Sequence, residues 1–268
     1  MTELSHSRRG QGPPLVLIHG IGSHWQVWSP VLDTVSRHRE VIALDLPGFG
    51  DSPPWPAPPP GGTAPGSVAH LADEVTAFLD RLGVRQPEVA GSSLGGGIAL
   101  ELGRRGLARR VTAFSPVGFW GGAGRRWCQA VVGAARTGAE RLGPALPRIM
   151  DSRAGRAAFC AVFYAHPARL DAADCLLAAR ALAAAPGFAD ARRSFGRLRP
   201  WTYTDAGELV RIPVTIAWGT RDAVLPYRTQ ARRARTVLPT ARHVRLPGCG
   251  HLPFADDPAA CARLLLSP

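Results

Sequence analysis

Residues 89–100 read VAGSSLGGGIAL, and the interpretation of the whole chain starts from this stretch. An apolar run ends at Ala90, and an apolar pattern with helical spacing follows the glycines. Gly91, Ser93 and Gly95 match Gly-x-Ser-x-Gly, in which a strand turns sharply into a helix and exposes the central serine hydroxyl above a sheet. The two glycines are required where the strand and helix backbones pass too closely for a Cβ atom.

The helix after this turn directs its N-terminus at Ser93, which favours negative charge developing there. We therefore predict that Ser93 is a nucleophile. By itself the pattern also fits an ordinary strand-to-helix turn with glycines for packing, so the prediction depends on partners elsewhere in the chain.

Six short apolar runs that end in Gly or Pro predict buried strands, and helical patterns separate several of them. This alternation predicts an α/β fold with a mostly parallel, doubly wound sheet and helices on both faces. The strands are expected at 13–20, 40–52, 87–93, 110–116, 212–219 and 242–248, and helices at 67–82 (with Ser67 as cap), 95–105, 227–237 and 257–266.

Two stretches interrupt this alternation. Residues 53–66 are rich in proline and glycine and predict a surface loop. Residues 119–205 contain no convincing strand and are rich in Ala, Leu and Arg, so we expect three to five helices that form an all-helical cap, or lid, inserted into the sheet. The predicted core is then made of residues 1–118 and 206–268.

The partners that a nucleophilic serine requires follow later strands, in the order Ser, Asp, His. Asp222 comes after the strand in WGTRDAVLP, and His251 follows the last strand in LPGCGHLPF. A neutral imidazole takes the serine proton, and a carboxylate holds the imidazole in the correct tautomer. Alternatively, Asp222 is a helix cap and His251 a loop histidine; their joint order and context favour a catalytic triad.

A hydrolytic serine also requires two backbone N–H groups that stabilise an oxyanion. We expect one from Leu94, directly after the nucleophile, and the other from Ile21 in the loop HGIGSHWQVW after the first strand. His19 is expected to be structural and to bond the local backbone. Aromatic side chains near this cleft or in the cap either line an apolar substrate pocket or pack in the core; they are Trp25, Trp28, Phe119 and Trp120, with Trp127, Phe159 and Phe163.

Composition limits the other classes of function. The chain has no secretory signal and no apolar run near the roughly 20 residues of a membrane helix, so we expect a cytoplasmic protein without integral membrane association. The five cysteines are scattered, which argues against a disulfide framework or zinc ribbon, and the eight histidines show no metal-binding spacing. We expect no metal and no cofactor.

The formal net charge is +12, and the positive charge comes entirely from arginine, because the chain has no lysine. A GC-rich coding sequence accounts for this composition; an anionic substrate or loose attachment to acidic surfaces is the alternative. No nucleic-acid-binding signature accompanies the charge, so we expect no nucleic-acid partner. A small-molecule substrate and a monomer or homodimer are expected.

These motifs together resemble the α/β-hydrolase-fold enzymes with a helical cap. The resemblance is carried by LVLIHGIGS, DLPGFGDS, VAGSSLGGGIALELG, WGTRD and GCGHLPFADDP. Within that superfamily the chain is similar to small carboxylesterases, to carbon–carbon-bond hydrolases and to cofactor-free haloperoxidase-like proteins. Ser93 argues against the branches that use an aspartate there, the haloalkane dehalogenases and epoxide hydrolases. Only 18 residues precede His19, fewer than is usual, so the antiparallel edge hairpin is expected to be shortened or absent.

The resulting prediction is a serine hydrolase that cleaves an ester-like bond of a small, largely apolar substrate through an acyl-enzyme. One alternative is a carbon–carbon-bond hydrolase of a vinylogous diketone, for which an arginine-lined cap pocket is expected. The other is a non-hydrolytic binding module on the same fold.

Overall fold

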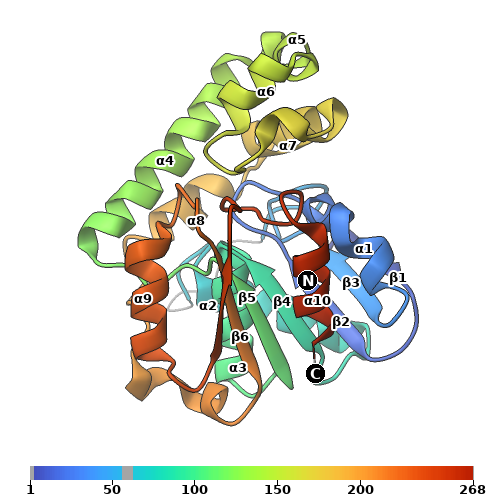
Figure 1. Cartoon of the computed structure of the whole chain (residues 1–268). Coiled ribbons are helices and arrows are strands. Elements are labelled where there is room, and N and C mark those ends of the chain that lie inside the picture. The colour runs from blue at the N-terminus through green and yellow to red at the C-terminus, as the bar shows by residue number, and fades with distance from the viewer. Residues whose placement is uncertain (1–2, 56–62, 268) are drawn as a thin grey trace.

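The computed structural model describes residues 3–55 and 63–267, so the middle of the predicted proline-rich loop lies outside the described residues. The described strands form one sheet in the order β1-β3-β2-β4-β5-β6-β7 (Figure 1). β1 is antiparallel to β3, and all other neighbours are parallel. The strands are β1 His6–Arg9, β2 Pro14–Ile18, β3 Glu40–Leu44, β4 Glu88–Ser92, β5 Arg110–Phe114, β6 Val214–Gly219 and β7 Arg242–Leu246.

All six predicted parallel strands are confirmed. Strands of a parallel sheet form apolar runs because helices usually cover both faces of the sheet. Along β2, Val16 and Ile18 pack into the core on one face, and Leu15 and Leu17 pack into the core on the other. The four predicted helices are also confirmed: α2 Val68–Arg81, α3 Leu94–Arg104, α9 Tyr227–Val237 and α10 Pro258–Leu266.

The helices divide between the two faces as a doubly wound fold requires. α2, α3 and α9 contribute to the core that contains Val16, whereas α10 and the unpredicted helix α1 Ser29–Val35 contribute to the core that contains Leu15. The sequence pattern missed α1 because it is only seven residues long and begins with Ser-Pro.

The edge of the sheet that the sequence left open is a single short strand. β1 pairs with β3 from His6↔Leu44 to Arg9↔Val41, and the Arg8 side chain forms an ion pair with Glu40 across the two strands at 2.6 Å. Its polar composition hid it from a search for apolar runs. Charged side chains are common on edge strands because they discourage pairing with another chain.

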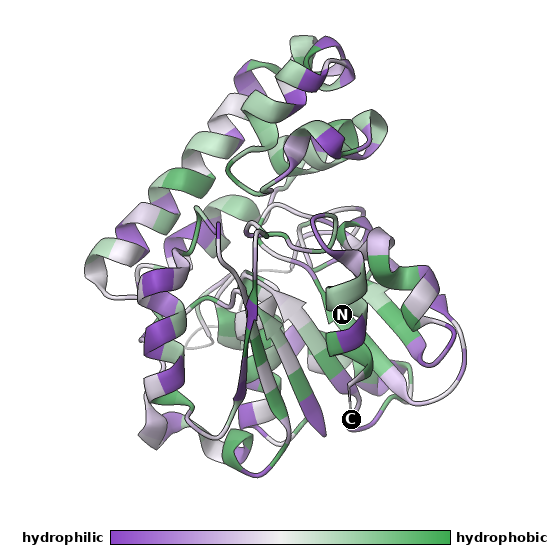
Figure 2. Cartoon of the chain, viewed as in Figure 1, coloured by the Kyte–Doolittle hydropathy of each residue, from purple (hydrophilic) through white to green (hydrophobic). Residues whose placement is uncertain are grey.

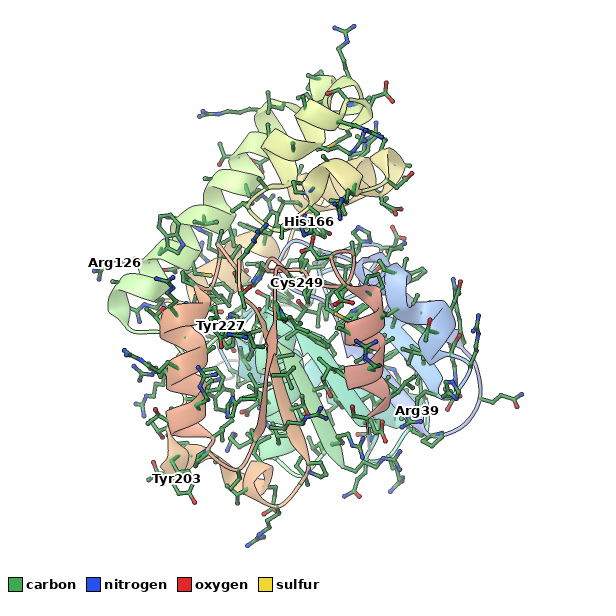
Figure 3. All side chains as sticks on the ribbon, viewed as in Figure 1. Arg39, Arg126, His166, Tyr203, Tyr227 and Cys249 are labelled. Carbon is green, nitrogen blue, oxygen red and sulfur yellow. The ribbon has the colours of Figure 1, made fainter. Side chains whose placement is uncertain are left out.

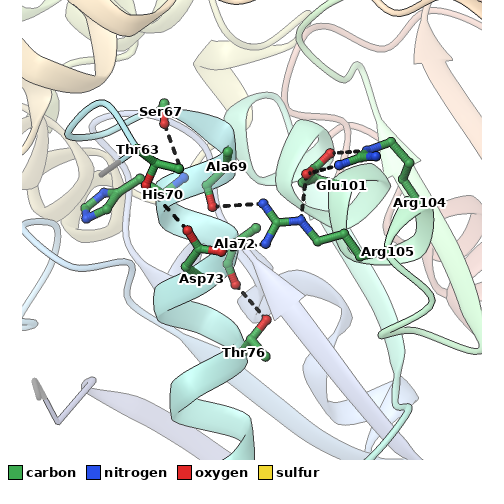
Figure 4. Close-up of polar contacts among 10 residues, drawn as sticks. All are labelled: Thr63, Ser67, Ala69, His70, Ala72, Asp73, Thr76, Glu101, Arg104 and Arg105. Atoms are coloured by element: carbon green, nitrogen blue, oxygen red, sulfur yellow. Dashed lines mark hydrogen bonds and ion pairs between the residues drawn. The ribbon is translucent and has the colours of Figure 1, made fainter. Parts of the chain in front are cut away.

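Helix α3, which follows Ser93, is fastened to α2 by a polar network (Figure 4). The Arg105 guanidinium bridges Asp73 of α2 and Glu101 of α3, at 2.5 and 2.6 Å, and Arg104 also binds Glu101. Burial alone would raise the pKa of the Glu101 carboxyl, but the hydrogen bonds from both arginines outweigh burial and lower that pKa. Ser67 caps α2 by accepting a hydrogen bond from the His70 N–H, as predicted.

Residues 119–205, called here the helical segment, connect β5 to β6 and contain the predicted upper number of five α-helices. In Figure 1, α5, α6 and α7 lie above the carboxyl ends of the strands, and α4 runs from them down towards α9. The segment has a small core of its own around Leu146, Met150 and Cys160, yet Phe188 and Ala191 of α8 belong to the main core. The helices are α4 Gly122–Arg141, α5 Leu146–Asp151, α6 Arg153–Cys160, α7 Ala172–Ala184 and α8 Phe188–Ser194.

Hydropathy agrees with this arrangement: the interior strands are mostly apolar, whereas the outer helix α9 is largely hydrophilic (Figure 2). Among the residues that the structure describes, no single helix is long and apolar enough to cross a membrane; only α7 and α8 taken together reach that length and composition, and the pair is bent by 75°.

Candidate active site

Ser93 lies in the turn between β4 and α3, with φ 56° and ψ −114°. A positive φ is costly for a residue with a Cβ atom, so the surrounding packing must hold this conformation. A Cβ on Gly91 would lie 2.0 Å from Gly95 O, and one on Gly95 would lie 2.2 Å from Ile18 O. Both glycines are therefore required by close backbone approach, as expected, and the backbone N–H of Ser93 is fixed by Phe114 O at 2.9 Å.

Asp222 and His251 are brought together from two loops, after β6 and β7. His251 Nδ1 lies 2.9 Å from Asp222 Oδ2, and both residues are buried. The other carboxylate oxygen, Oδ1, accepts hydrogen bonds from the N–H groups of Val224 and Leu225 at 2.9 and 2.7 Å. Because a carboxylate can only accept, the imidazole proton belongs on Nδ1, which leaves the lone pair of Nε2 available as a base.

Ser93, Asp222 and His251 follow β4, β6 and β7, and because these strands are parallel, all three residues lie at the same end of the sheet. Within residues 3–55 and 63–267, the Ser93 hydroxyl makes no hydrogen bond to His251. Such bonds are often long or poorly aligned in ligand-free enzymes and tighten when the substrate binds.

The two N–H groups expected to stabilise an oxyanion have no hydrogen-bond acceptor in the described part of the chain. Leu94 is the first residue of α3, where an N–H has no intrahelical partner. Ile21 follows Gly20, and a Cβ on Gly20 would lie 3.1 Å from Ser93 Cβ and 3.7 Å from Ser93 Oγ. The loop that carries Ile21 therefore passes directly beside Ser93.

His19 holds this loop in place, as predicted. Its Nδ1–H donates to Gly20 O at 2.7 Å, and its Nε2 accepts from the Leu46 N–H at 2.9 Å. Burial lowers the pKa of the His19 imidazole to about 3, so the ring is neutral at ordinary pH. This neutral tautomer ties the Ile21 loop to the end of β3.

The sequence analysis did not identify Asp45, although it is the charged residue directly after β3 in DLPGFGDS. Its carboxylate accepts hydrogen bonds from Trp25 N–H at 2.7 Å and Asp51 N–H at 3.0 Å. Burial raises the pKa of Asp45, and these backbone hydrogen bonds oppose that shift. Asp45 thereby ties the loop around Trp25 to the loop after β3.

Asp256 was also missed, and it connects the helical segment to the His251 loop. Its Oδ2 accepts from Ala165 N–H at 3.0 Å and Gly250 N–H at 2.8 Å, and its Oδ1 accepts from His166 N–H at 3.0 Å. His166 lies at this junction in Figure 3. The signal in the sequence was the doubled acid in FADDP, in which only the second, Asp257, caps α10.

A cavity of about 340 Å³ lies between the helical segment and the core. Ile21 and Leu252, the neighbour of His251, belong to its wall, as do Phe159 and Phe163 of the predicted aromatic set. The four predicted pocket aromatics do not line this cavity: Trp28, Phe119 and Trp120 are buried in the two main cores, and Trp25 packs against one of them. The sequence could not distinguish a pocket from the core, because a large aromatic side chain suits both. In the structure these four side chains pack in or against the main cores.

The described residues contain no group of three or more His, Cys, Asp and Glu side chains that could hold a metal ion. What the arrangement offers chemically is a hydroxyl in a sharp turn, a carboxylate-bound imidazole and two free N–H groups beside a largely apolar cavity.

This combination of a mostly parallel sheet, a serine turn and a paired histidine and aspartate is typical of the hydrolases built on α/β sheets. The model of the alpha/beta hydrolase family matches residues 15–264, and the chain belongs to that family.

Two curated proteins and one solved structure illustrate the breadth of the relatives. An uncharacterized protein of Mycobacterium tuberculosis is 31% identical over 93% of this chain and 73% of its own length. The 2-hydroxy-6-oxo-2,4-heptadienoate hydrolase of Pseudomonas putida is 28% identical over 90% of this chain and 83% of its own. A thermophilic esterase from Thermogutta terrifontis has the same fold, with a TM-score of 0.69 and 21% identity over 98% of this chain and 91% of that one.

Proposed function

We propose that the protein is a serine hydrolase in which Ser93, His251 and Asp222 act as a catalytic triad on an ester-like bond. The observation that carries the proposal is the buried pair of His251 Nδ1 and Asp222 Oδ2 at 2.9 Å, on the side of the sheet where Ser93 occupies its sharp turn. Because Asp222 pairs with Nδ1, the other ring nitrogen, Nε2, is left without a proton, which supports its role as the base that removes the serine proton.

The reaction proceeds in two halves. His251 Nε2 removes the Ser93 proton while Ser93 Oγ attacks the carbonyl carbon, and the N–H groups of Leu94 and Ile21 stabilise the oxyanion. His251 then protonates the leaving group, which departs and leaves an acyl group on Ser93. A water molecule, activated by the same imidazole, releases the acid, while Asp222 stabilises the imidazolium in both halves.

The cavity beside Ile21 supports a small, largely apolar substrate. Its walls are mostly aliphatic and aromatic side chains, which favours an uncharged acyl or alcohol group. In this proposal the helical segment acts as a cap, because α6 and α7 form the wall of the cavity opposite the core.

The relationship to the Pseudomonas putida hydrolase favours a second candidate, cleavage of a carbon–carbon bond in a vinylogous diketone. Such a substrate that also carries a carboxylate would be attracted by arginines in the cap. Among the described residues around the cavity, the carboxylates Asp171 and Asp174 outnumber the one guanidinium, Arg169. This local charge favours an uncharged ester over an anionic diketone.

Labelling with a fluorophosphonate, followed by intact-mass analysis and peptide mapping, tests the nucleophile. We expect one adduct per chain on Ser93, loss of the adduct in Ser93→Ala, and full labelling in Ser92→Ala, whose hydroxyl is buried one residue away. An unlabelled but folded wild-type protein would favour the binding module over the enzyme.

A panel of matched substrates separates the two reactions. Short neutral esters and vinylogous diketones with and without a carboxylate are compared by kcat/KM in wild type and Ser93→Ala. We expect turnover of the neutral esters; exclusive turnover of the carboxylate-bearing diketone would replace the ester proposal with carbon–carbon cleavage.

A further inference from the structure

Two cysteines of the helical segment face each other although neither belongs to a recognisable motif. Cys160 ends α6 and Cys175 lies in the second turn of α7. Both are buried in the small core that they share with Leu146, Met150 and Ala179, and the two thiols interact with each other electrostatically. This shared core, built from two different helices, distinguishes them from a pair of thiols that are merely near in sequence.

Both thiols are also placed where a small reagent can reach them. Cys160 and Cys175 belong to the wall of the cavity of about 340 Å³, whereas Cys128, Cys249 and Cys261 do not. Those three are buried in the main cores. Burial raises the pKa of Cys128 to about 12 and that of Cys249 to about 11, so both thiols stay protonated and unreactive.

The two thiols are not electrically equivalent. The interaction with Cys160 lowers the pKa of Cys175 despite its burial, and the charge of Arg156 lowers it further. The same interaction raises the pKa of Cys160. Arg156 is itself held in place, because its guanidinium donates to the carbonyls of Met150 and Asp151 at 2.5 and 2.9 Å. Since the thiolate is the reactive form, Cys175 is the attacking group and Cys160 the resolving one.

We propose that Cys160 and Cys175 form a hydroperoxide-reactive dithiol site, and that their oxidation to a disulfide joins α6 to α7 across the wall of the cavity. The Cys175 thiolate attacks one oxygen of the hydroperoxide, the O–O bond breaks, and the alcohol or water leaves with a proton. This gives a sulfenic acid on Cys175. Cys160 sulfur then attacks Cys175 sulfur and displaces water, so that two thiols and one hydroperoxide yield one disulfide, one alcohol and one water.

The disulfide would change the cavity as well as the thiols. α6 and α7 are separate helices joined by residues 161–171, and a covalent link between them closes a loop of the chain and fixes one wall of the cavity. Formation of the bond does not depend on the proposed function. Only its effect on ester turnover does, so the two can fail separately.

The test treats the folded wild-type protein with a small excess of hydrogen peroxide or an alkyl hydroperoxide, followed by alkylation and unfolding. We expect the mass to fall by about 2 Da before alkylation. The alkylatable thiols should fall by two from the original five, and a peptide joining Cys160 to Cys175 should appear and vanish after dithiothreitol. Because this readout uses the wild type, it does not require any variant to fold.

Variants assign the order of the steps. Cys160→Ser should accumulate a dimedone-reactive sulfenic acid on Cys175, Cys175→Ser should resist oxidation at both positions, and Cys128→Ser should behave like the wild type. A stable sulfinic acid on Cys175 without the cross-link, or loss of thiols spread evenly over all five cysteines, would overturn the proposal. Ester turnover measured in the same samples, with and without dithiothreitol, then shows whether the cross-link alters the enzyme.

Discussion

The carboxyl end of the sheet, which carries Ser93, and the helical segment above it are built in different ways. At this carboxyl end, backbone groups of β2, β4 and α3 lie so close that glycine is required at Gly91 and Gly95. In α4 of the helical segment, by contrast, a Cβ on Gly138 would meet nothing within 4 Å. Glycine is therefore a packing requirement at Gly91 and Gly95 and only a loss of helix propensity at Gly138.

This difference teaches where the molecule can change shape. The candidate catalytic groups are buried and held by hydrogen bonds that join Asp222 to His251 and to two backbone N–H groups, and by one from the Ser93 N–H to Phe114 O, which favours one fixed geometry. By contrast, α5, α6 and α7 share a separate core of five buried residues, and α6 and α7 form one wall of the cavity. Regions with few buried contacts open at a lower free-energy cost than the main core, so movement should concentrate in α5, α6 and α7.

The strongest test of the fixed geometry at the carboxyl end of the sheet is Asp222→Asn. The asparagine oxygen can still accept from the N–H groups of Val224 and Leu225, so the loop should keep its shape. Its amide would donate to His251 Nδ1 and force the imidazole proton onto Nε2, the wrong tautomer for a base. We expect kcat for the ester to fall by about 10³–10⁴-fold, with unfolding in urea changed by less than about 1 kcal/mol.

An unchanged kcat in that variant would mean that Asp222 does not orient the base. A large loss of stability would instead mean that its carboxylate is needed mainly for the loop. Ser93→Ala, assayed in parallel, gives the lower limit of activity against which the loss is measured.

The contrast between the two glycines is tested directly by substitution with alanine. Gly95→Ala places a methyl group against the carbonyl oxygens of Ile18 and His19, at 2.2 and 2.4 Å, and backbone atoms cannot move aside cheaply. We expect a loss of about 3 kcal/mol or more in the free energy of unfolding, or no folded protein. Gly138→Ala should raise stability by about 0.5–1 kcal/mol. Both substitutions are measured by urea denaturation. Equal changes in the free energy of unfolding would show that Gly95 is no more constrained by packing than Gly138.

The same contrast explains what the sequence could predict. Buried parallel strands produce uninterrupted apolar runs, and a turn that demands glycine leaves a fixed pattern around Ser93, so six strands, four helices and the Ser93 turn were all found. The chain order then pointed to Asp222 and His251, which the structure brings together.

The rest depends on contacts between distant residues. Asp45 and Asp256 accept hydrogen bonds from backbone N–H groups. Almost every residue type has such a group, so the partner cannot be recognised from the sequence. For Trp28 and Trp120 the sequence left a pocket and the core both open, because an aromatic side chain suits either place, and the structure buries both in the main cores. The Cys160–Cys175 contact depends on how α6 packs on α7, and no spacing rule encodes that packing.

His19 provides a third test, through the pH dependence of stability. Because burial lowers its pKa to about 3, the folded imidazole stays neutral while the unfolded one binds a proton below its ordinary pKa of 6.5. Acid therefore favours unfolding, and stability falls as the pH drops from about 6.5 towards about 3. Between pH 7 and pH 5 we expect this group to remove about 2 kcal/mol.

The measurement compares urea denaturation of the wild type and His19→Gln over that range. Glutamine does not titrate there and can still accept from the Leu46 N–H, so its curve should be flatter by about that amount. Parallel curves would show that the imidazole gains its proton within the folded protein, and the Ile21 loop would then be looser than its hydrogen bonds indicate.

The smallest effects should come from the junction between the two regions, where adjacent aspartates have different roles. Asp256 accepts from Ala165, His166 and Gly250, whereas Asp257 only caps α10 through the Ala260 N–H at 2.9 Å. We expect each alanine substitution to cost about 1 kcal/mol in global stability. Only Asp256→Ala should speed amide exchange at Ala165 and Gly250 and lower kcat/KM, by about tenfold, because the His251 loop loses its attachment.

Asp257→Ala is the matched control for that substitution, since it removes the neighbouring carboxylate without touching the helical segment. Faster exchange at Ala165 in both variants would mean that the junction responds to general destabilisation. Faster exchange in Asp256→Ala alone would place the boundary between the fixed and the movable regions at this carboxylate. Asp256 comes two residues after Phe254, whose side chain still packs in the core. The helical segment would then move about contacts that the His251 loop itself supplies.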